Sequence, residues 1–183
     1  MKVQLYMAMS LDGVIALPEG SEEFLSHQNW QTFCEAVAEH RCFVVGRKTF
    51  EAVSAWTGPY NFDSFHDVTK IVVSRKNTGM SKPGYNFVSS PEDALRVAQT
   101  RGHSSLVVTG GGELNNAFLQ RDLVDNLVVN IEPVVVGAGI RLFGDTGTLV
   151  RLQFIDTKLL PEGILQVRYA VMRGEQEREA HRA

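Results

Sequence analysis

The 183-residue sequence lacks the features that would tie it to a membrane or to nucleic acid. It has no apolar run close to the roughly 20 residues of a membrane-spanning helix. Its first residues, MKVQLYMAMSLDG, indicate a buried strand rather than a secretion signal. Eighteen Lys and Arg residues against 21 Asp and Glu give a net charge of -3, which argues against binding to polyanions. We therefore expect a cytoplasmic protein without a nucleic-acid or membrane partner.

Cysteine and metal-binding patterns are also scarce. The two cysteines, Cys34 and Cys42, form no CxxC pattern, and the five histidines form no HExxH pattern. We expect reduced, buried cysteines and no metal site. The chain is 44% hydrophobic and 21% charged, as is typical of globular proteins. Its length predicts a single domain over 1–173, followed by a polar tail at 174–183.

The order of apolar runs and helical spacings predicts the fold class. Runs typical of strands occupy 3–9, 42–45, 70–73, 85–88, 105–108 and 126–131. Helical spacings or helix-start signals lie between them at 29–40, 48–55, 91–101 and 115–120. The last segments, 149–160 and 164–172, are typical of an antiparallel pair. The alternation predicts an α/β fold, with helices on both faces of a mainly parallel sheet and an antiparallel C-terminal edge.

Glycine follows two of the predicted strands and precedes a helix, in VVTGGG (Gly110, Gly111, Gly112) and in FVVGRKTF (Gly46). A helix amino terminus exposes unpaired N–H groups and a partial positive charge, and glycine lets a phosphate approach the backbone. The carboxyl ends of parallel strands share one edge of a sheet, where ligands of open α/β sheets bind. The alternative interpretation of each junction is a tight turn, with Arg47 and Lys48 in a solvated first turn.

A third polar group, Ser74-Arg75-Lys76, directly follows the predicted strand KIVV. A hydroxyl and two cations at a strand end suit one more phosphate. Together with the glycine junctions, this pattern favours a dinucleotide that carries an extra 2′-phosphate. Arg75 would then favour the phosphorylated cofactor over the unphosphorylated one.

These segments also resemble a known family. AMSLDGVIA, VVGRKTFEAV, KIVVSR and VVTGGGELNNAFLQRDLVDNLVVNIEPVVVGAGIRLF occur in the order found in the dihydrofolate reductase-like superfamily. The sequence is most similar to the riboflavin-biosynthesis reductase branch, the RibD C-terminal-like domain. The resemblance implies a three-layer α/β fold, NADPH as cofactor, and hydride transfer to a heterocyclic C=N or imine-like carbon of a small-molecule substrate. It also implies a homodimer.

The resemblance further implies roles for individual residues. Positions 46–49 would contact cofactor phosphates, 74–75 the 2′-phosphate, 110–113 the pyrophosphate, and 8 with 14–15 the nicotinamide. The cofactor-binding residues are thus Ala8, Val14, Ile15, Gly46, Arg47, Lys48, Thr49, Ser74, Arg75, Gly110, Gly111, Gly112, Glu113 and Leu114. Members of the family often have a cis peptide within the glycine pair. Asp12 and Trp30 are the candidate catalytic residues beside the substrate, although Asp12-Gly13 is also a common turn pair and Trp30 suits the core.

The sequence departs from both branches where the substrate would bind. Asn29 and Trp30 stand where folate reductases carry a carboxylate, and the segment 20–40 is poor in the cations that would hold a ribose phosphate. We predict an NADPH-dependent reductase of the riboflavin-biosynthesis type. The alternatives are a dihydrofolate reductase and a nucleotide-binding module without catalysis.

Overall fold

The computed structural model describes residues 1–173 except 57, 59, 76–78, 145–146 and 148. The predicted phosphate contact at Lys76 and the predicted tail at 174–183 therefore lie outside the described residues. The strands are β1 (Lys2–Ser10), β2 (Val14–Ala16), β3 (Cys42–Gly46), β4 (Thr69–Val73), β5 (Tyr85–Val88), β6 (Ser105–Val108), β7 (Asn126–Glu132), β8 (Ile140–Arg141), β9 (Leu152–Leu159) and β10 (Leu165–Val171). The helices are α1 (His27–His40), α2 (Arg47–Ala55), α3 (Pro91–Thr100) and α4 (Gly112–Leu119), with short 3-10 turns η1 (Phe62–Ser64) and η2 (Pro161–Gly163).

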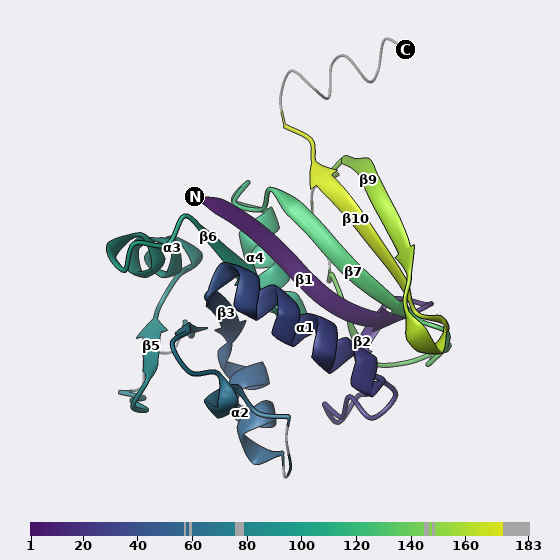
Figure 1. Ribbon diagram of the computed structural model, residues 1–183, viewed down its shortest axis with the longest axis horizontal. Helices are drawn as coiled ribbons and strands as arrows, with labels where there is room; N and C mark the ends of the chain where they lie inside the picture. Colours follow the sequence, from purple (N-terminus) through teal and green to yellow (C-terminus); the bar gives the residue numbers. More distant parts are fainter. Residues whose placement is uncertain (57, 59, 76–78, 145–146, 148, 174–183) are drawn as a thin grey trace.

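Eight strands form one sheet in the order β5-β4-β3-β6-β1-β7-β10-β9. The six strands from β5 to β7 run parallel to their neighbours, whereas β10 pairs antiparallel with β7 and β9 pairs antiparallel with β10. Figure 1 shows the antiparallel pair at one side of the molecule and β5 at the other. The predicted α/β class, mainly parallel sheet and antiparallel C-terminal edge are confirmed.

Helices cover both faces of the sheet and bury its alternating apolar side chains. One cluster contains Leu114 and Phe118 of α4 and Ala94 of α3, packed on side chains such as Val44 and Leu106. The cluster on the other face contains side chains of α1 and α2, packed on the alternate strand positions. Because successive strand residues point to opposite faces, strands buried on both faces appear in the sequence as the continuous apolar runs noted above.

One small sheet was not predicted from the sequence, and several helix and strand boundaries differ by a few residues from those predicted. Strands β2 and β8 form a separate two-stranded antiparallel sheet, with Val14 opposite Arg141 and Ala16 opposite Ile140. Strands of three and two residues are too short to produce a visible alternation. The helix predicted to start at 115 begins at Gly112, so the last glycine belongs to its first turn. Among the described residues, none of the helices combines the length and apolar character needed to cross a bilayer.

Candidate functional site

The two glycine junctions lie side by side, because β3 and β6 are paired neighbours in the sheet. The N–H of Gly46 donates to the carbonyl oxygen of Gly110 at 2.7 Å, and the N–H of Thr109 donates to Val44 at 2.9 Å. Helix α2 therefore starts next to helix α4, at the same edge of the sheet. Segments more than 60 positions apart form one surface, as the parallel-sheet argument predicts.

Neither helix start is capped by a side chain. The residue before α2 is Gly46 and the residue before α4 is Gly111, and neither helix has a side-chain hydrogen bond capping its first turn. A β-carbon added to Gly111 would lie 3.2 Å from the Thr49 hydroxyl, so the two helix starts approach closely there. The peptide bond between Gly110 and Gly111 is cis, as the resemblance implies, and Gly110 has a φ of +83° that favours glycine. Unpaired N–H groups and two partial positive charges thus meet in one place.

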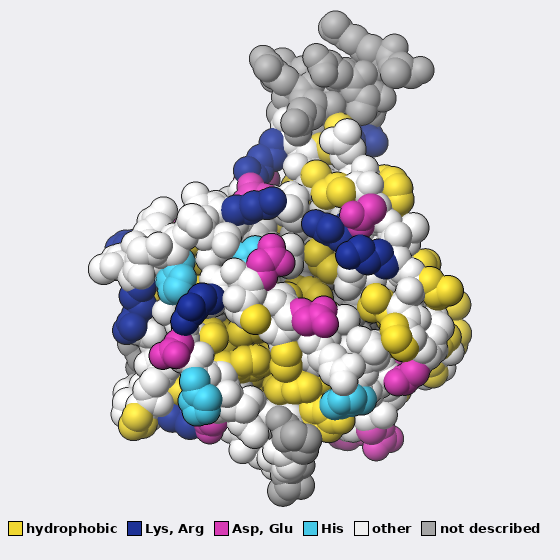
Figure 2. Space-filling model, viewed as in Figure 1, with side chains coloured by type: hydrophobic (Ala, Val, Ile, Leu, Met, Phe, Trp, Pro, Cys, Tyr) yellow, Lys and Arg dark blue, Asp and Glu magenta, His cyan; other side chains and the backbone are white. Residues whose placement is uncertain are grey.

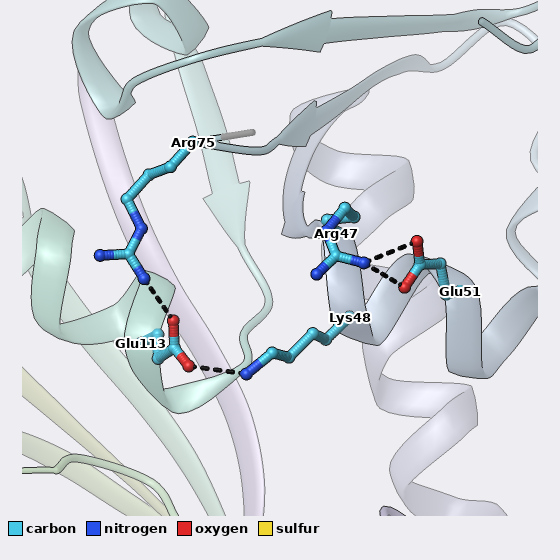
Figure 3. A network of polar contacts seen from close by, with 5 residues as sticks. All are labelled: Arg47, Lys48, Glu51, Arg75 and Glu113. Carbon is cyan, nitrogen blue, oxygen red and sulfur yellow. Dashed lines mark hydrogen bonds and ion pairs between the residues drawn. The ribbon is translucent and has the colours of Figure 1, made fainter. Parts of the chain in front are cut away.

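Three cations surround these helix starts (Figure 3). Glu113 of α4 accepts from Lys48 Nζ and from the Arg75 guanidinium, each at 2.9 Å. Arg47 pairs with Glu51 one turn further along α2, at 2.6 Å. The hydrogen bond from Lys48 is the main reason that the pKa of Glu113 lies below its usual value, and Arg75 adds to this. Lys48 of α2 and Arg75, which follows β4, therefore converge on one carboxylate of α4 at the edge where anions are predicted to bind.

A cavity of about 450 Å³ opens beside this edge, between α1, α2 and the loop that follows β2. Figure 2 shows hydrophobic side chains gathered on this face of the molecule. Thr49 and Gly111 belong to its lining, which joins it to the glycine edge. Ala8 and Ile15 also line it, as predicted for residues that border the reacting part of a cofactor.

The cavity wall is rich in aromatic rings. Trp30 lies 5.6 Å from Tyr60 in an edge-to-face arrangement and 5.6 Å from Phe33, measured between ring centroids. Trp56, Tyr6 and Phe62 complete the aromatic lining. Trp30 therefore lines the cavity and packs on the aromatic cluster at the same time, so the two interpretations given for it are compatible. The His27 ring contacts the Tyr60 hydroxyl at 2.8 Å at the cavity mouth.

A buried polar network joins two lining residues, Tyr6 and Asn29, to the sheet. The amide nitrogen of Asn130 donates to the Tyr6 hydroxyl at 2.9 Å and to the side-chain oxygen of Asn29 at 2.7 Å. The Asn29 amide nitrogen in turn donates to Glu132, which also accepts from the backbone N–H of Ser26 at 2.7 Å. Burial raises the pKa of Tyr6 to about 12. Both ends of the Asn29 amide are thus used within the protein, and the buried Glu132 carboxylate fixes the start of α1.

Asp12 lies outside the cavity lining described here. Its carboxylate accepts from the backbone N–H groups of Val136 and Gly137, at 3.0 and 2.8 Å, and from the Ser10 hydroxyl at 2.7 Å. These hydrogen bonds, with that from Val136 the strongest influence, lower its pKa to about 2. The contacts give Asp12 an anchoring role for the loop after β7 and provide no support for the catalytic role predicted for it.

The remaining predicted residues lie either in the core or near the glycine edge. Val14 and Leu114 are buried in the core. Ser74, directly after β4, is also buried, and Arg75 beside it is exposed. Sequence reasoning missed the loop carboxyl Glu22 and the rings of Trp56 and Tyr60, all of which line the cavity. They belong to loops without periodicity, so no local pattern placed them there.

Comparison with known proteins agrees with this architecture. Residues 1–166 match the family model of the RibD C-terminal domain. The chain is 29% identical over 171 residues to the uncharacterized protein YwjB of Bacillus subtilis (strain 168), which covers 89% of this chain and 94% of that one.

Two solved structures share the fold. A protein of Shewanella sp. PV-4, named as a riboflavin biosynthesis protein, superposes with a TM-score of 0.77 at 23% identity, over 94% of this chain and all of that one. A dihydrofolate reductase of Enterococcus faecalis, solved with NADP(H), gives a TM-score of 0.68 at 17% identity, over 94% and 97% of the two chains. The fold is thus that of the dihydrofolate reductase-like reductases, and the match over most of its length places the chain in the RibD C-terminal domain family.

Proposed function

We propose that this protein is an NADPH-dependent reductase that acts on a small heterocyclic or imine-like substrate. The observation that carries the proposal is that the glycine edge, formed by the two helix starts, and the aromatic cavity share residues. Gly111 and Thr49 stand at the uncapped helix starts and also line the aromatic cavity. A dinucleotide held at the glycine edge would therefore have its far end at the cavity.

The described residues fit such a cofactor. The backbone N–H groups at the starts of α2 and α4 suit the pyrophosphate, since glycine leaves the approach open. Lys48 and Arg75 are exposed cations that can exchange the Glu113 carboxylate for a phosphate. Ala8 and Ile15 would border the nicotinamide. The cofactor would supply the hydride, and the protein would bind and orient both partners.

Two other functions make different predictions. A dihydrofolate reductase needs a carboxylate toward the pterin, and here the Asn29 amide at that place is already bonded to Glu132 and Asn130. A nucleotide-binding module without catalysis would bind NADPH and reduce nothing. Family membership alone does not separate these alternatives, because one fold supports many functions.

One experiment distinguishes the three functions. NADPH binding is measured by titration, and NADPH oxidation is then followed with a phosphoribosylaminopyrimidine, dihydrofolate and a cyclic imine. We expect binding, turnover of a heterocycle or imine, and poor turnover of dihydrofolate, because loss of a specific polar partner can cost orders of magnitude in kcat/KM. Efficient reduction of dihydrofolate would favour the second function, and binding without any turnover would favour the third. Failure to bind NADPH would overturn the proposal.

We also propose that the protein is a homodimer joined through the β9–β10 side of the sheet. Strand β9 is the edge strand, and its apolar side chains are exposed, including Phe154 at 59% and Leu159 at 78%. Figure 2 shows hydrophobic side chains along this side of the molecule. An exposed edge strand with apolar side chains is typical of an interaction surface. Light scattering should give the mass of a dimer, and Phe154→Glu should give a monomer that still binds NADPH.

A further inference from the structure

The cavity is lined by acidic rather than basic side chains. Its lining contains two carboxyl groups, Glu22 and Glu23, and among the described residues it contains no Lys or Arg. The cations of the site, Lys48 and Arg75, are all exposed at the glycine edge instead. A substrate that carries a phosphate would find no positively charged partner in this lining, and it would lie beside two carboxyl groups.

Glu22 is the more buried of the two carboxyls. It lies on the loop between β2 and α1, and within the described part of the chain no hydrogen bond or ion pair is formed by its carboxyl group. Burial raises its pKa to about 7, because the charged form loses solvation without gaining a partner. The side chain is partly buried at the cavity wall, and a carboxylate in such a partly desolvated site is stabilised by a nearby cation. The Glu22 carboxyl therefore has capacity for a cation that the protein itself does not supply.

The aromatic lining favours the same kind of ligand. Trp30 lies 5.6 Å from both Phe33 and Tyr60, measured between ring centroids, and all three rings line the cavity. Flat apolar rings fit between such side chains, and a positive charge is attracted to the face of an aromatic ring. Shape and charge in the cavity thus point to one chemical class.

We propose that the substrate cavity recognises a flat nitrogen heterocycle that is positively charged and carries no phosphate, with Glu22 as the residue that determines this specificity. This inference rests on the reductase function proposed above and narrows its substrate to a cyclic iminium or protonated imine. A permanent iminium displaces the proton of Glu22, and a basic imine accepts it. Both routes end in the same carboxylate–cation pair.

The charge is consistent with the proposed reaction. When a hydride adds to the carbon of a C=N⁺ group, its two electrons form the new C–H bond. The former C=N pair becomes the lone pair on nitrogen, and the product amine is neutral. The hydride comes from the nicotinamide cofactor of the proposed function, which is oxidised, and no further reductant is needed.

Binding to the protein without cofactor tests the inference. Three two-ring probes of similar shape differ in charge at pH ~8: 2-methylisoquinolinium is a cation, isoquinoline is neutral, and 1-naphthyl phosphate is an anion. The chain has two tryptophans, Trp30 and Trp56, and both line the cavity, so their indole N–H resonances in ¹⁵N spectra report binding there. We expect the cation to bind about ten-fold more tightly than the neutral probe, the effect of one charged contact. The anion should not shift these resonances.

Two variants assign the preference to Glu22. Glu22→Gln keeps the size of the side chain and removes its charge, so the cation should then bind no more tightly than isoquinoline. Glu19→Gln makes the same change at an exposed position in the same loop outside the lining, and it should retain the preference. Equal or tighter binding of the phosphate probe to the wild-type protein would overturn the proposal. Retention of the cation preference in Glu22→Gln would remove Glu22 from it.

The result is independent of the reductase test. If NADPH fails to bind but the cation preference is present and depends on Glu22, the cavity's specificity stands and the proposed redox reaction does not. If NADPH is bound and oxidised but only with anionic heterocycles, the reductase function stands and the substrate class proposed here is wrong.

Discussion

The glycine edge and the aromatic cavity share a boundary but are built in opposite ways. At the edge, backbone N–H groups of two helix starts and the exposed cations Lys48 and Arg75 offer positive charge over a polar surface. In the cavity, the lining combines aromatic rings with the carboxyls of Glu22 and Glu23. The first suits an anion and the second a cation. Such a site can hold an anionic cofactor at the edge and a cationic hydride acceptor in the cavity, because each ligand is attracted to a different region.

The largest effect should come from closing the boundary between the two regions. In Gly111→Val, the added side chain would enter the narrow space between the two helix starts. Its β-carbon alone would lie 3.2 Å from the Thr49 hydroxyl. Gly111 has an ordinary extended conformation (φ −73°), so a side chain there meets no backbone strain. We therefore expect steric exclusion of the cofactor, with NADPH affinity reduced more than about 100-fold, or ~2.7 kcal/mol. Fluorescence titration measures it.

The matched control is Gly144→Val. A β-carbon at Gly144 would lie 3.1 Å from the Asn116 side-chain amide, a contact of similar closeness at a position outside the cavity lining. Both variants should unfold at similar temperatures, and only Gly111→Val should lose the cofactor. Normal NADPH binding by folded Gly111→Val would mean that the glycines serve only the turn.

A smaller loss of NADPH affinity is expected when one cation of the glycine edge is removed and the backbone of the edge is kept. Arg75→Ala removes one cation that is 85% exposed and leaves the backbone of the helix starts unchanged. A hydrogen bond between charged groups contributes about 1.5–3 kcal/mol, and exposure places Arg75 at the lower end, so NADPH should bind about ten-fold more weakly. NADH affinity should not change. Arg96→Ala, which removes an arginine that is 72% exposed and paired with Asp93, is the control. Equal affinities of wild-type protein for both cofactors would remove the role of Arg75.

The two regions also differ in how far the sequence predicts them. The edge depends on local patterns, because an apolar run followed by Gly46 or Gly110 marks a strand that ends where a helix starts, and parallel pairing then brings the two together. The cavity depends on contacts between segments of no regular pattern. Glu22 and Tyr60 belong to separate loops, and only the packing of α1 and α2 on the sheet puts both on one wall.

Asp12 and Asn29 also show that the sequence does not predict contacts between distant segments. Asp12 was predicted to lie beside the substrate, and Asn29 stands where folate reductases carry a carboxylate. Each is instead bonded at or just beyond the end of β7, Asp12 to Val136 and Asn29 to Glu132. The sequence reveals that a polar side chain needs a partner, and it does not reveal which partner is within reach.

The third variant, Glu22→Gln, tests how strongly the cavity disfavours a charged Glu22, by its effect on folding stability at two pH values. The pKa of Glu22 is raised in the folded protein from an ordinary value of 4.5 to about 7. A raised carboxyl pKa means that the folded state holds the proton more tightly. The stability from this protonated form is complete below the ordinary pKa and is lost as pH rises through about 7. Glu22→Gln should therefore match wild type at pH ~4.5 and exceed it at pH ~8, by about 1 kcal/mol after allowance for partial exposure.

This difference corresponds to about 2–4 °C in Tm for a chain of this size. Thermal melts at the two pH values measure it, with Glu19→Gln as the control at an exposed site of the same loop. A variant that melts with wild type at both pH values would show that the Glu22 carboxyl is solvated, which would weaken the argument for a cation partner.

The smallest effect concerns Glu113, the acid that pairs with two cations of the positive edge. Its carboxylate pairs with Lys48 and Arg75, the two cations that we assign to cofactor phosphates, and its own side chain is 66% exposed (Figure 3). A phosphate that binds must displace it, so Glu113→Gln should strengthen NADPH binding about two- to three-fold, the range of an exposed ion pair. The gain should shrink at high salt, because screening weakens both competitors. Glu92→Gln, which breaks the exposed pair with Arg121, is the control. Weaker binding by Glu113→Gln would show that the carboxylate contacts the cofactor directly, as the family resemblance implies, and that its pairing with the cations serves to orient it.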